Sequence, residues 1–104
     1  MKADLWEKFG ARFIGSARAR VARARPAIDT QSRDAVMTIL NEMHALSGEA
    51  SMIGVPKIAQ LAKSLEAAAK RWNAAQTKEE ITREIASCVA GLRELSAAVE
   101  ALVE

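Results

Sequence analysis

Apolar residues recur at intervals of three and four along most of this chain. Residues spaced in this way lie on one face of an α-helix, because the helix has 3.6 residues per turn. An apolar face is stable only when it is buried against another element, so the spacing restricts the chain to helices packed on one another. Gly and Pro, which interrupt helices, number only five and two among 104 residues. The sequence therefore predicts an all-α fold.

Breaks in the spacing divide the chain into four predicted helices. Their expected ranges are about 5–24, 33–52, 56–72 and 78–103. Pro26 is expected to end the first helix, because proline lacks an N–H donor and clashes with the preceding turn. The expected apolar face of that helix consists of Trp6, Phe9, Phe13, Ala17, Val21 and Ala24. The expected N-terminal caps are Asp4 with Glu7 for the first helix, Thr30 or Ser32 for the second, and Thr77 with Glu80 for the last.

Short connections between such helices favour an antiparallel up-and-down four-helix bundle, with room for an extra short helix. The length predicts a single domain over residues 1–104, and we expect a monomer. The chain has no apolar run long enough for a membrane span and no apolar block at its start, so we expect a cytoplasmic protein that does not enter membranes. With one Cys, Cys88, and one His it offers no zinc ligand set, and we expect neither a metal nor a cofactor.

Positive charge is concentrated at the start of the chain. Residues 1–25 contain seven Lys and Arg against two acidic residues, whereas residues 26–104 contain eight against eleven. Clustered arginines suit an acidic protein surface or nucleic acid, but such a run is most often a solvated helix face. No aromatic residue or recognition-helix motif accompanies the later arginines of this run, so we expect no nucleic-acid binding.

His44 is the main candidate for chemistry, since the chain has no Tyr and only one His. Histidine acts as a nucleophile or general base near neutral pH. Its neighbours on one strip of the second helix are mostly small or polar. They are Leu40, Asn41, Ser47, Gly48 and Ser51. A glycine costs about 1 kcal/mol relative to alanine inside a helix, so close approach by another protein explains Gly48 better than helix stability does.

The predicted turn at Gly54 brings further residues toward His44. In a helical hairpin centred there, a residue at 44 lies opposite about 64, and the candidate neighbours are Gln60, Lys63, Ser64 and Glu66. A carboxylate that accepts the Nδ1 proton fixes the tautomer of an imidazole and raises the basicity of Nε2, and we expect Glu66 to do so. A nucleophilic imidazole can attack an acyl phosphate, and the phosphoryl group that it then carries needs positive charge or hydrogen-bond donors nearby. Lys63 and the hydroxyls of Ser47 and Ser64 are the candidates for these contacts.

The stretch from His44 to Gly54 resembles the signature of histidine-containing phosphotransfer domains. That signature is roughly H-x-L-(K/A)-G-x-A-x-x-x-G with a downstream L-E. The chain has His44-Ala45-Leu46-Ser47-Gly48-Glu49-Ala50-Ser51-Met52-Ile53-Gly54 and later Leu65-Glu66. The likeness is specific over about residues 33–73. It implies a four- or five-helix bundle whose exposed histidine, here His44, accepts a phosphoryl group from a receiver aspartate or a kinase and passes it to another receiver.

The resemblance also implies a phosphocarrier in a two-component phosphorelay rather than a turnover enzyme. Its partners would be response-regulator receiver domains, a sensor histidine kinase, or both. The expected partner-binding residues are Leu40, Asn41, Gly48 and Ser51, and the glutamate that binds the histidine in some members falls at Glu66. Many members have Lys where this chain has Ser47. Positive charge beside the phosphoryl group is then left to Lys63 or to the partner.

Two other interpretations stay open. A degenerate domain would present the same surface and bind receivers or kinases without accepting a phosphoryl group on His44. A nucleic-acid-binding protein would present one exposed patch made of Arg18, Arg20, Arg23 and Arg25, and its affinity would fall steeply with salt.

Overall fold

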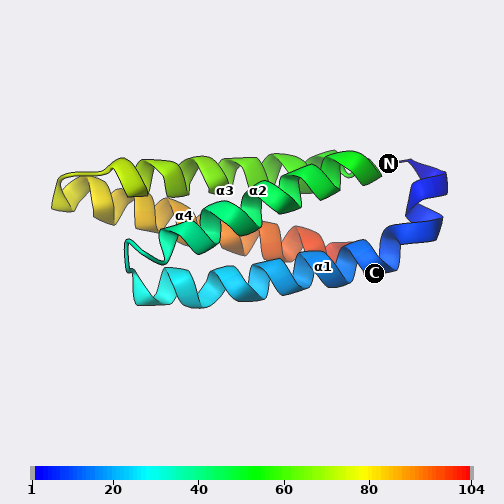
Figure 1. Cartoon of the computed structure of the whole chain (residues 1–104), viewed down its shortest axis with the longest axis horizontal. Coiled ribbons are helices and arrows are strands. Elements are labelled where there is room, and N and C mark those ends of the chain that lie inside the picture. The colour runs from blue at the N-terminus through cyan, green and yellow to red at the C-terminus, as the bar shows by residue number, and fades with distance from the viewer. Residues whose placement is uncertain (1, 104) are drawn as a thin grey trace.

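The computed structural model describes residues 2–103 and contains four helices. They are α1 (Ala3–Thr30), α2 (Val36–Ile53), α3 (Pro56–Ala74) and α4 (Lys78–Ala101). Consecutive helices pack against each other and α1 also packs against α4, which closes a bundle 47 Å long and 19 by 18 Å across (Figure 1). The predicted all-α, up-and-down bundle is confirmed. None of the helices within residues 2–103 combines the length and the apolar character needed to cross a bilayer.

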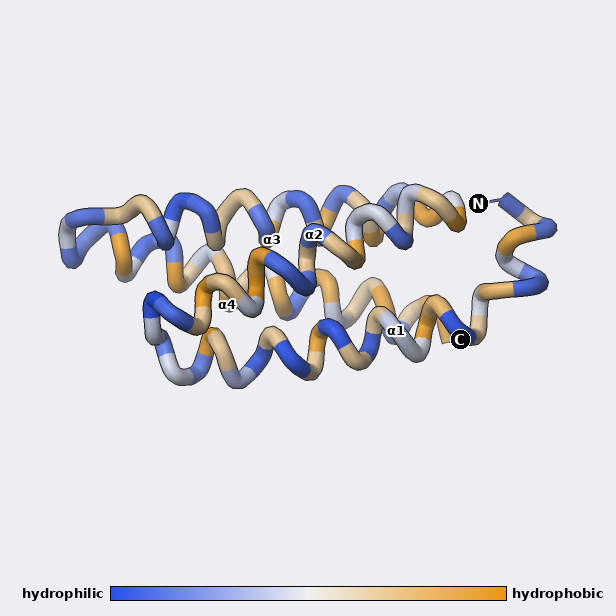
Figure 2. The backbone as a smooth tube through the Cα atoms, viewed as in Figure 1, coloured by the Kyte–Doolittle hydropathy of each residue, from blue (hydrophilic) through white to orange (hydrophobic). Residues whose placement is uncertain are grey.

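One apolar core runs along the bundle. Each helix contributes a stripe to it, and Figure 2 shows apolar residues recurring turn after turn along all four helices. The largest fully buried side chains are Val36, Ile39, Met43, Leu46, Ile58, Leu65, Trp72, Cys88, Leu95 and Val99. Most of these belong to α2 and α3, so the hairpin formed by these two helices is firmly anchored in the core.

Helix α1 continues past Pro26, so its predicted end before this proline is wrong. The proline removes the hydrogen bond to the Ala22 carbonyl, at a cost of about 3 kcal/mol in a helix interior. Pro26 and Ala22 are both exposed, which leaves that carbonyl open to water. The next two residues, Ala27 and Ile28, are buried, and burying an isoleucine side chain contributes about 1.5–3 kcal/mol. Burial in the core therefore carries the helix through the proline.

The predicted N-terminal caps are only partly correct. The Thr77 hydroxyl accepts a hydrogen bond from the Glu80 N–H at 3.1 Å, which confirms the cap of α4. Helices α1 and α2 start without a side-chain cap, so the caps expected at Asp4 and at Thr30 or Ser32 are wrong. The residue before α2 already has helical backbone angles, whereas a capping side chain needs an extended residue there. The Ser32 hydroxyl instead accepts a backbone N–H inside the preceding turn.

The start of α1 departs from the expected apolar face. Phe9, which was expected in the core, is 43% exposed. The Trp6 indole lies over Gly10, where an added Cβ would come within 3.0 Å of the ring, and it also packs against Phe13 with ring centroids 6.4 Å apart. Glycine at position 10 thus lets the indole approach the helix closely, while Phe9 remains at the surface.

Candidate functional site

His44 lies in the middle of α2 and projects away from the core. Its side chain is 78% exposed, whereas Met43 and Leu46 beside it are fully buried. The buried stripe holds α2 in place, so the imidazole is presented to solvent on a rigid helix rather than on a loop.

Glu66 of α3 binds the imidazole from across the hairpin. Its Oε2 atom lies 3.1 Å from His44 Nδ1. A carboxylate only accepts hydrogen bonds, so a neutral imidazole in this contact carries its proton on Nδ1 and leaves a lone pair on Nε2. The Glu66 side chain is 15% exposed, which holds its carboxylate between the two helices. Gly54, with φ of 82°, ends α2 in the left-handed conformation and closes the hairpin that sets this register.

Lys70 is a third member of this cluster. It is not among the neighbours of His44 that the hairpin geometry predicts. Its Nζ lies 3.9 Å from Glu66 Oε2, the same oxygen that faces His44 Nδ1. Lysine four residues after glutamate on a helix is a favourable spacing for an ion pair. The spacing of Glu66 and Lys70 in the sequence is therefore a signal for this ion pair. A comparison of only those residues that lie directly across the hairpin from His44 does not detect it.

Neither Ser47 nor Lys63 makes a hydrogen bond or ion pair with the imidazole within residues 2–103. Ser47 is 6% exposed, and its hydroxyl donates to the His44 carbonyl at 2.9 Å, so it is engaged by the backbone of its own helix. Lys63 is exposed on α3 and takes part in none of the ion pairs found within residues 2–103. The structure therefore groups Glu66 and Lys70 with the imidazole, while the expectation that Ser47 contacts a phosphoryl group draws no support from its position.

The strip of α2 beside His44 is open. Asn41, Gly48 and Ser51 are exposed, and Leu40 is half-buried at its edge. A Cβ built on Gly48 would have no neighbouring atom within 4 Å, so packing within this chain does not require glycine there. The missing side chain leaves a low surface one helical turn from the imidazole.

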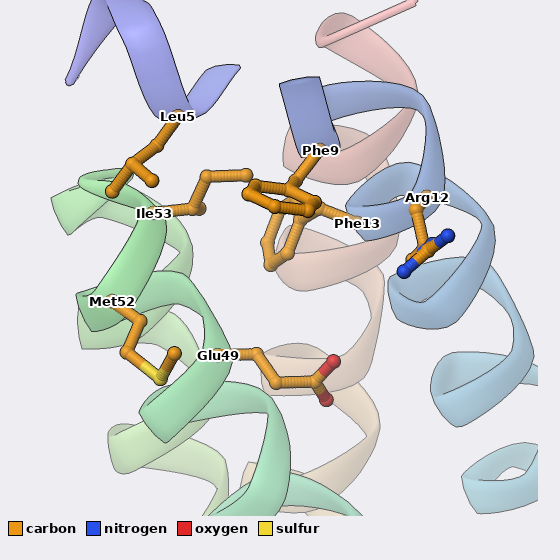
Figure 3. Close-up of a pocket in the computed structure, with 7 residues that line it drawn as sticks. All are labelled: Leu5, Phe9, Arg12, Phe13, Glu49, Met52 and Ile53. Atoms are coloured by element: carbon orange, nitrogen blue, oxygen red, sulfur yellow. The ribbon is translucent and has the colours of Figure 1, made fainter. Parts of the chain in front are cut away.

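An apolar hollow lies next to this strip, between α1 and α2 (Figure 3). It is lined by Leu5, Phe9, Arg12, Phe13, Glu49, Met52 and Ile53. Met52 is 75% exposed and follows Gly48 by one helical turn, so the hollow borders the strip that carries His44. The helical spacing of the sequence does not predict this hollow, because it places Phe9 in the core.

The arginines of α1 do not form one exposed patch. Three of the five pair with carboxylates of two different helices. The pairs are Arg20 with Glu42 and Glu49 of α2, Arg23 with Glu42 of α2, and Arg18 with Glu100 of α4. The hydrogen bond from Arg18 lowers the pKa of the Glu100 carboxyl, and Arg25 lines the same α1–α4 hollow as Arg18. This division contradicts the single patch that the nucleic-acid interpretation requires.

Other candidates for chemistry are few in the described chain. Within residues 2–103, no group of three or more His, Cys, Asp or Glu side chains is placed to hold a metal ion. Cys88 is buried, and its burial, together with the charge of Glu84, raises the pKa of its thiol to about 11. The thiol therefore stays protonated near neutral pH and is a poor nucleophile.

One protein-family model, described as the Hpt domain, matches residues 10–104. The matched range contains α2 and α3, and with them the cluster of His44, Glu66 and Lys70. Residues 2–9, which supply Leu5 and Phe9 to the hollow, precede it. No curated protein and no solved structure matches the chain.

Proposed function

The chain belongs to the Hpt domain family, and from this we propose that it is a phosphocarrier of a two-component phosphorelay. His44 would accept a phosphoryl group from a receiver aspartate or a sensor histidine kinase and pass it to a receiver domain. Membership of this family supports histidine phosphotransfer as the activity. The observation that carries the proposal is an exposed imidazole whose Nδ1 is bound by Glu66, with no hydrogen bond to Nε2 found within residues 2–103.

In the proposed reaction, the lone pair of His44 Nε2 attacks the phosphorus of an aspartyl phosphate in line. The Nε2–P bond forms as the P–O bond breaks, and the electron pair leaves with the aspartate carboxylate. The imidazole keeps its Nδ1 proton and becomes positively charged, and the Glu66 carboxylate at 3.1 Å stabilises that charge. Transfer to the next receiver is the reverse of these steps. Any catalytic magnesium would belong to the partner, so this chain supplies the nucleophile and the docking face.

The proposed docking face is the strip of Leu40, Asn41, Gly48 and Ser51. Three of these residues are exposed, and the strip surrounds the imidazole on α2. The low surface at Gly48 would let the rim of a receiver pocket approach Nε2. The hollow at Met52 and Phe9 extends the face toward α1 with apolar surface, which commonly marks an interaction site. We also propose that the bundle works as a monomer.

A degenerate docking module is the second candidate. It is favoured by Ser47, which replaces the lysine of many relatives and directs its hydroxyl to the helix backbone. Such a module would bind receivers through the same strip and carry no phosphoryl group. Binding alone therefore does not separate the two candidates.

Phosphoryl transfer to the wild type and to His44→Gln tests the proposal. Purified receivers and kinases would be phosphorylated with radiolabelled donor, mixed with each protein, and the label followed for acid lability and base stability. We expect such label on the wild type and none on His44→Gln. Receiver binding with no label on the wild type would establish the docking module instead, and label that persists on His44→Gln would place the phosphorylated residue elsewhere.

A further inference from the structure

We propose that Lys70 is the phosphoryl-binding residue of this site, holding positive charge beside the phosphoryl group on His44. The inference rests on the proposed function and adds a residue to it. It replaces the role expected for Lys63, which makes no hydrogen bond or ion pair with His44 or Glu66 within residues 2–103.

The contacts of the Glu66 carboxylate link Lys70 to His44. One carboxylate oxygen, Glu66 Oε2, lies 3.1 Å from His44 Nδ1 and 3.9 Å from Lys70 Nζ. The ammonium group and the imidazole therefore share one carboxylate oxygen before any phosphoryl group arrives. Its side chain is 68% exposed, so the flexible stem is free to turn toward a group on Nε2.

Charge balance gives the reason for such a residue. A phosphoryl group carries a charge of about −1.5 to −2 near neutral pH. On Nε2 it would sit on the same imidazole that the Glu66 carboxylate binds, and the two negative groups would repel each other. One ammonium group that contacts the carboxylate and reaches the phosphoryl oxygens reduces this repulsion, and it donates charge-assisted hydrogen bonds.

The other nearby positions do not supply this charge. Position 47 holds a serine whose hydroxyl is bound to the His44 carbonyl. On α1, Arg20 and Arg23 are bound by the glutamates of the opposite flank of α2. Lys70 is thus the cation that the described ion pairs connect to the His44 and Glu66 pair.

Lys63 provides a matched control for Lys70. Both are exposed lysines of α3, and they lie seven residues apart, which places them about 20° apart on the helix. Replacing either by alanine removes one positive charge from the same face. Of the two lysines, only Lys70 forms an ion pair with the Glu66 carboxylate. A difference in phosphohistidine occupancy between the two variants would therefore come from this contact and not from the change in net charge.

The experiment uses phosphoramidate as a chemical donor, which requires no partner protein. The wild type, Lys70→Ala, Lys70→Arg and Lys63→Ala would be phosphorylated, and the rate and final occupancy of phosphohistidine followed by phosphorus NMR. The phosphorus chemical shift would then be titrated with pH. We expect Lys70→Ala to lower the final occupancy about two- to fivefold, which is the range for one exposed ion pair. It should also raise the pH at which the phosphoryl dianion takes up a proton to become the monoanion, because a nearby cation favours the dianion.

Lys70→Arg should restore both values, and Lys63→Ala should match the wild type. The titration distinguishes a contact between Lys70 and the phosphoryl group from a purely structural role of Lys70. Loss of the ion pair within α3 alone would not change the pH at which the phosphoryl group is protonated. Identical titrations for Lys70→Ala and the wild type would overturn the inference while leaving the proposed function in place. A loss confined to Lys63→Ala would also overturn it. A wild type that takes up no phosphoryl group on His44 would overturn both.

Discussion

The two central residues of the site differ sharply in exposure. His44 is 78% exposed and Glu66 only 15%. The imidazole that we propose to react is therefore open to a partner, while the carboxylate proposed to orient it is sheltered between two helices. A sheltered carboxylate is less screened by salt and water than a surface one, so its effect on the imidazole is retained in the cell.

Glu66→Gln should lower the rate of phosphoryl uptake by His44 about tenfold. Glutamine keeps the size of the side chain and a hydrogen-bond acceptor, but it removes the negative charge that stabilises the imidazolium, and losing such an orienting partner commonly costs ten- to a hundredfold. The rate would be measured under single-turnover conditions with phosphoramidate. Glu100→Gln is the control, because it removes a carboxylate that binds Arg18 on the far helix pair. Equal rates for both variants would contradict the role of Glu66.

Residue patterns predicted the pairing at the site but not every side chain in it. The turn at Gly54 fixes the hairpin, so counting outward from it brings His44 near Glu66, and the contact is present. The direction of the Ser47 hydroxyl was not predictable in the same way. Serine inside a helix has a competing acceptor in the carbonyl one turn earlier, and only the packed structure shows which partner it takes.

At the scale of the helices, packing decided the points that local signals predicted wrongly. Pro26 was a strong local stop signal, yet the burial of Ile28 keeps α1 helical to Thr30. Phe9 matched the apolar spacing, yet the close contact of Trp6 with Gly10 leaves it at the surface. The four helices themselves were predictable because their apolar stripes are regular, whereas these exceptions depend on contacts between distant segments.

Gly48→Gln should separate the stability of α2 from its use in docking. The fold leaves room for a side chain at position 48, and glutamine is a better helix former than glycine, so the free energy of unfolding should rise by about 0.5 kcal/mol. The bulkier residue beside His44 should lower the rate of transfer from a phosphorylated receiver by at least about tenfold. Urea unfolding and receiver-dependent transfer are the two measurements.

Gly15→Gln is the matched control for this variant. Gly15 is an exposed helix glycine of α1 with no atom near an added Cβ, so the gain in stability should be the same. It does not lie on α2, and transfer should be unchanged. Transfer that survives in Gly48→Gln at the rate of Gly15→Gln would remove Gly48 from the docking face.

At the scale of the whole molecule, arginines of α1 form ion pairs that link this helix to its two neighbours in the bundle. Three of the five arginines of α1 bind glutamates, Arg20 and Arg23 on α2 and Arg18 on α4. This arrangement argues against the single exposed basic patch that a nucleic-acid interface in the N-terminal segment would need.

The chain should accordingly bind duplex DNA no more tightly than a Kd of about 100 µM at physiological salt, the weak end of non-specific binding. Fluorescence anisotropy of a labelled duplex would measure this. The double variant Glu42→Gln and Glu49→Gln, which frees Arg20 and Arg23 from their carboxylates, serves as the positive comparison and should bind more tightly. Micromolar binding by the wild type with a steep dependence on salt would show that the arginines are available after all.

The hairpin of α2 and α3 has a consequence for how the site comes into being. His44 and Glu66 are 22 residues apart, and the segment between them contains a single tight turn. Bringing them together requires the closure of one short loop, a small loss of chain entropy compared with joining α1 to α4. The reactive centre is local in sequence although the bundle around it is not.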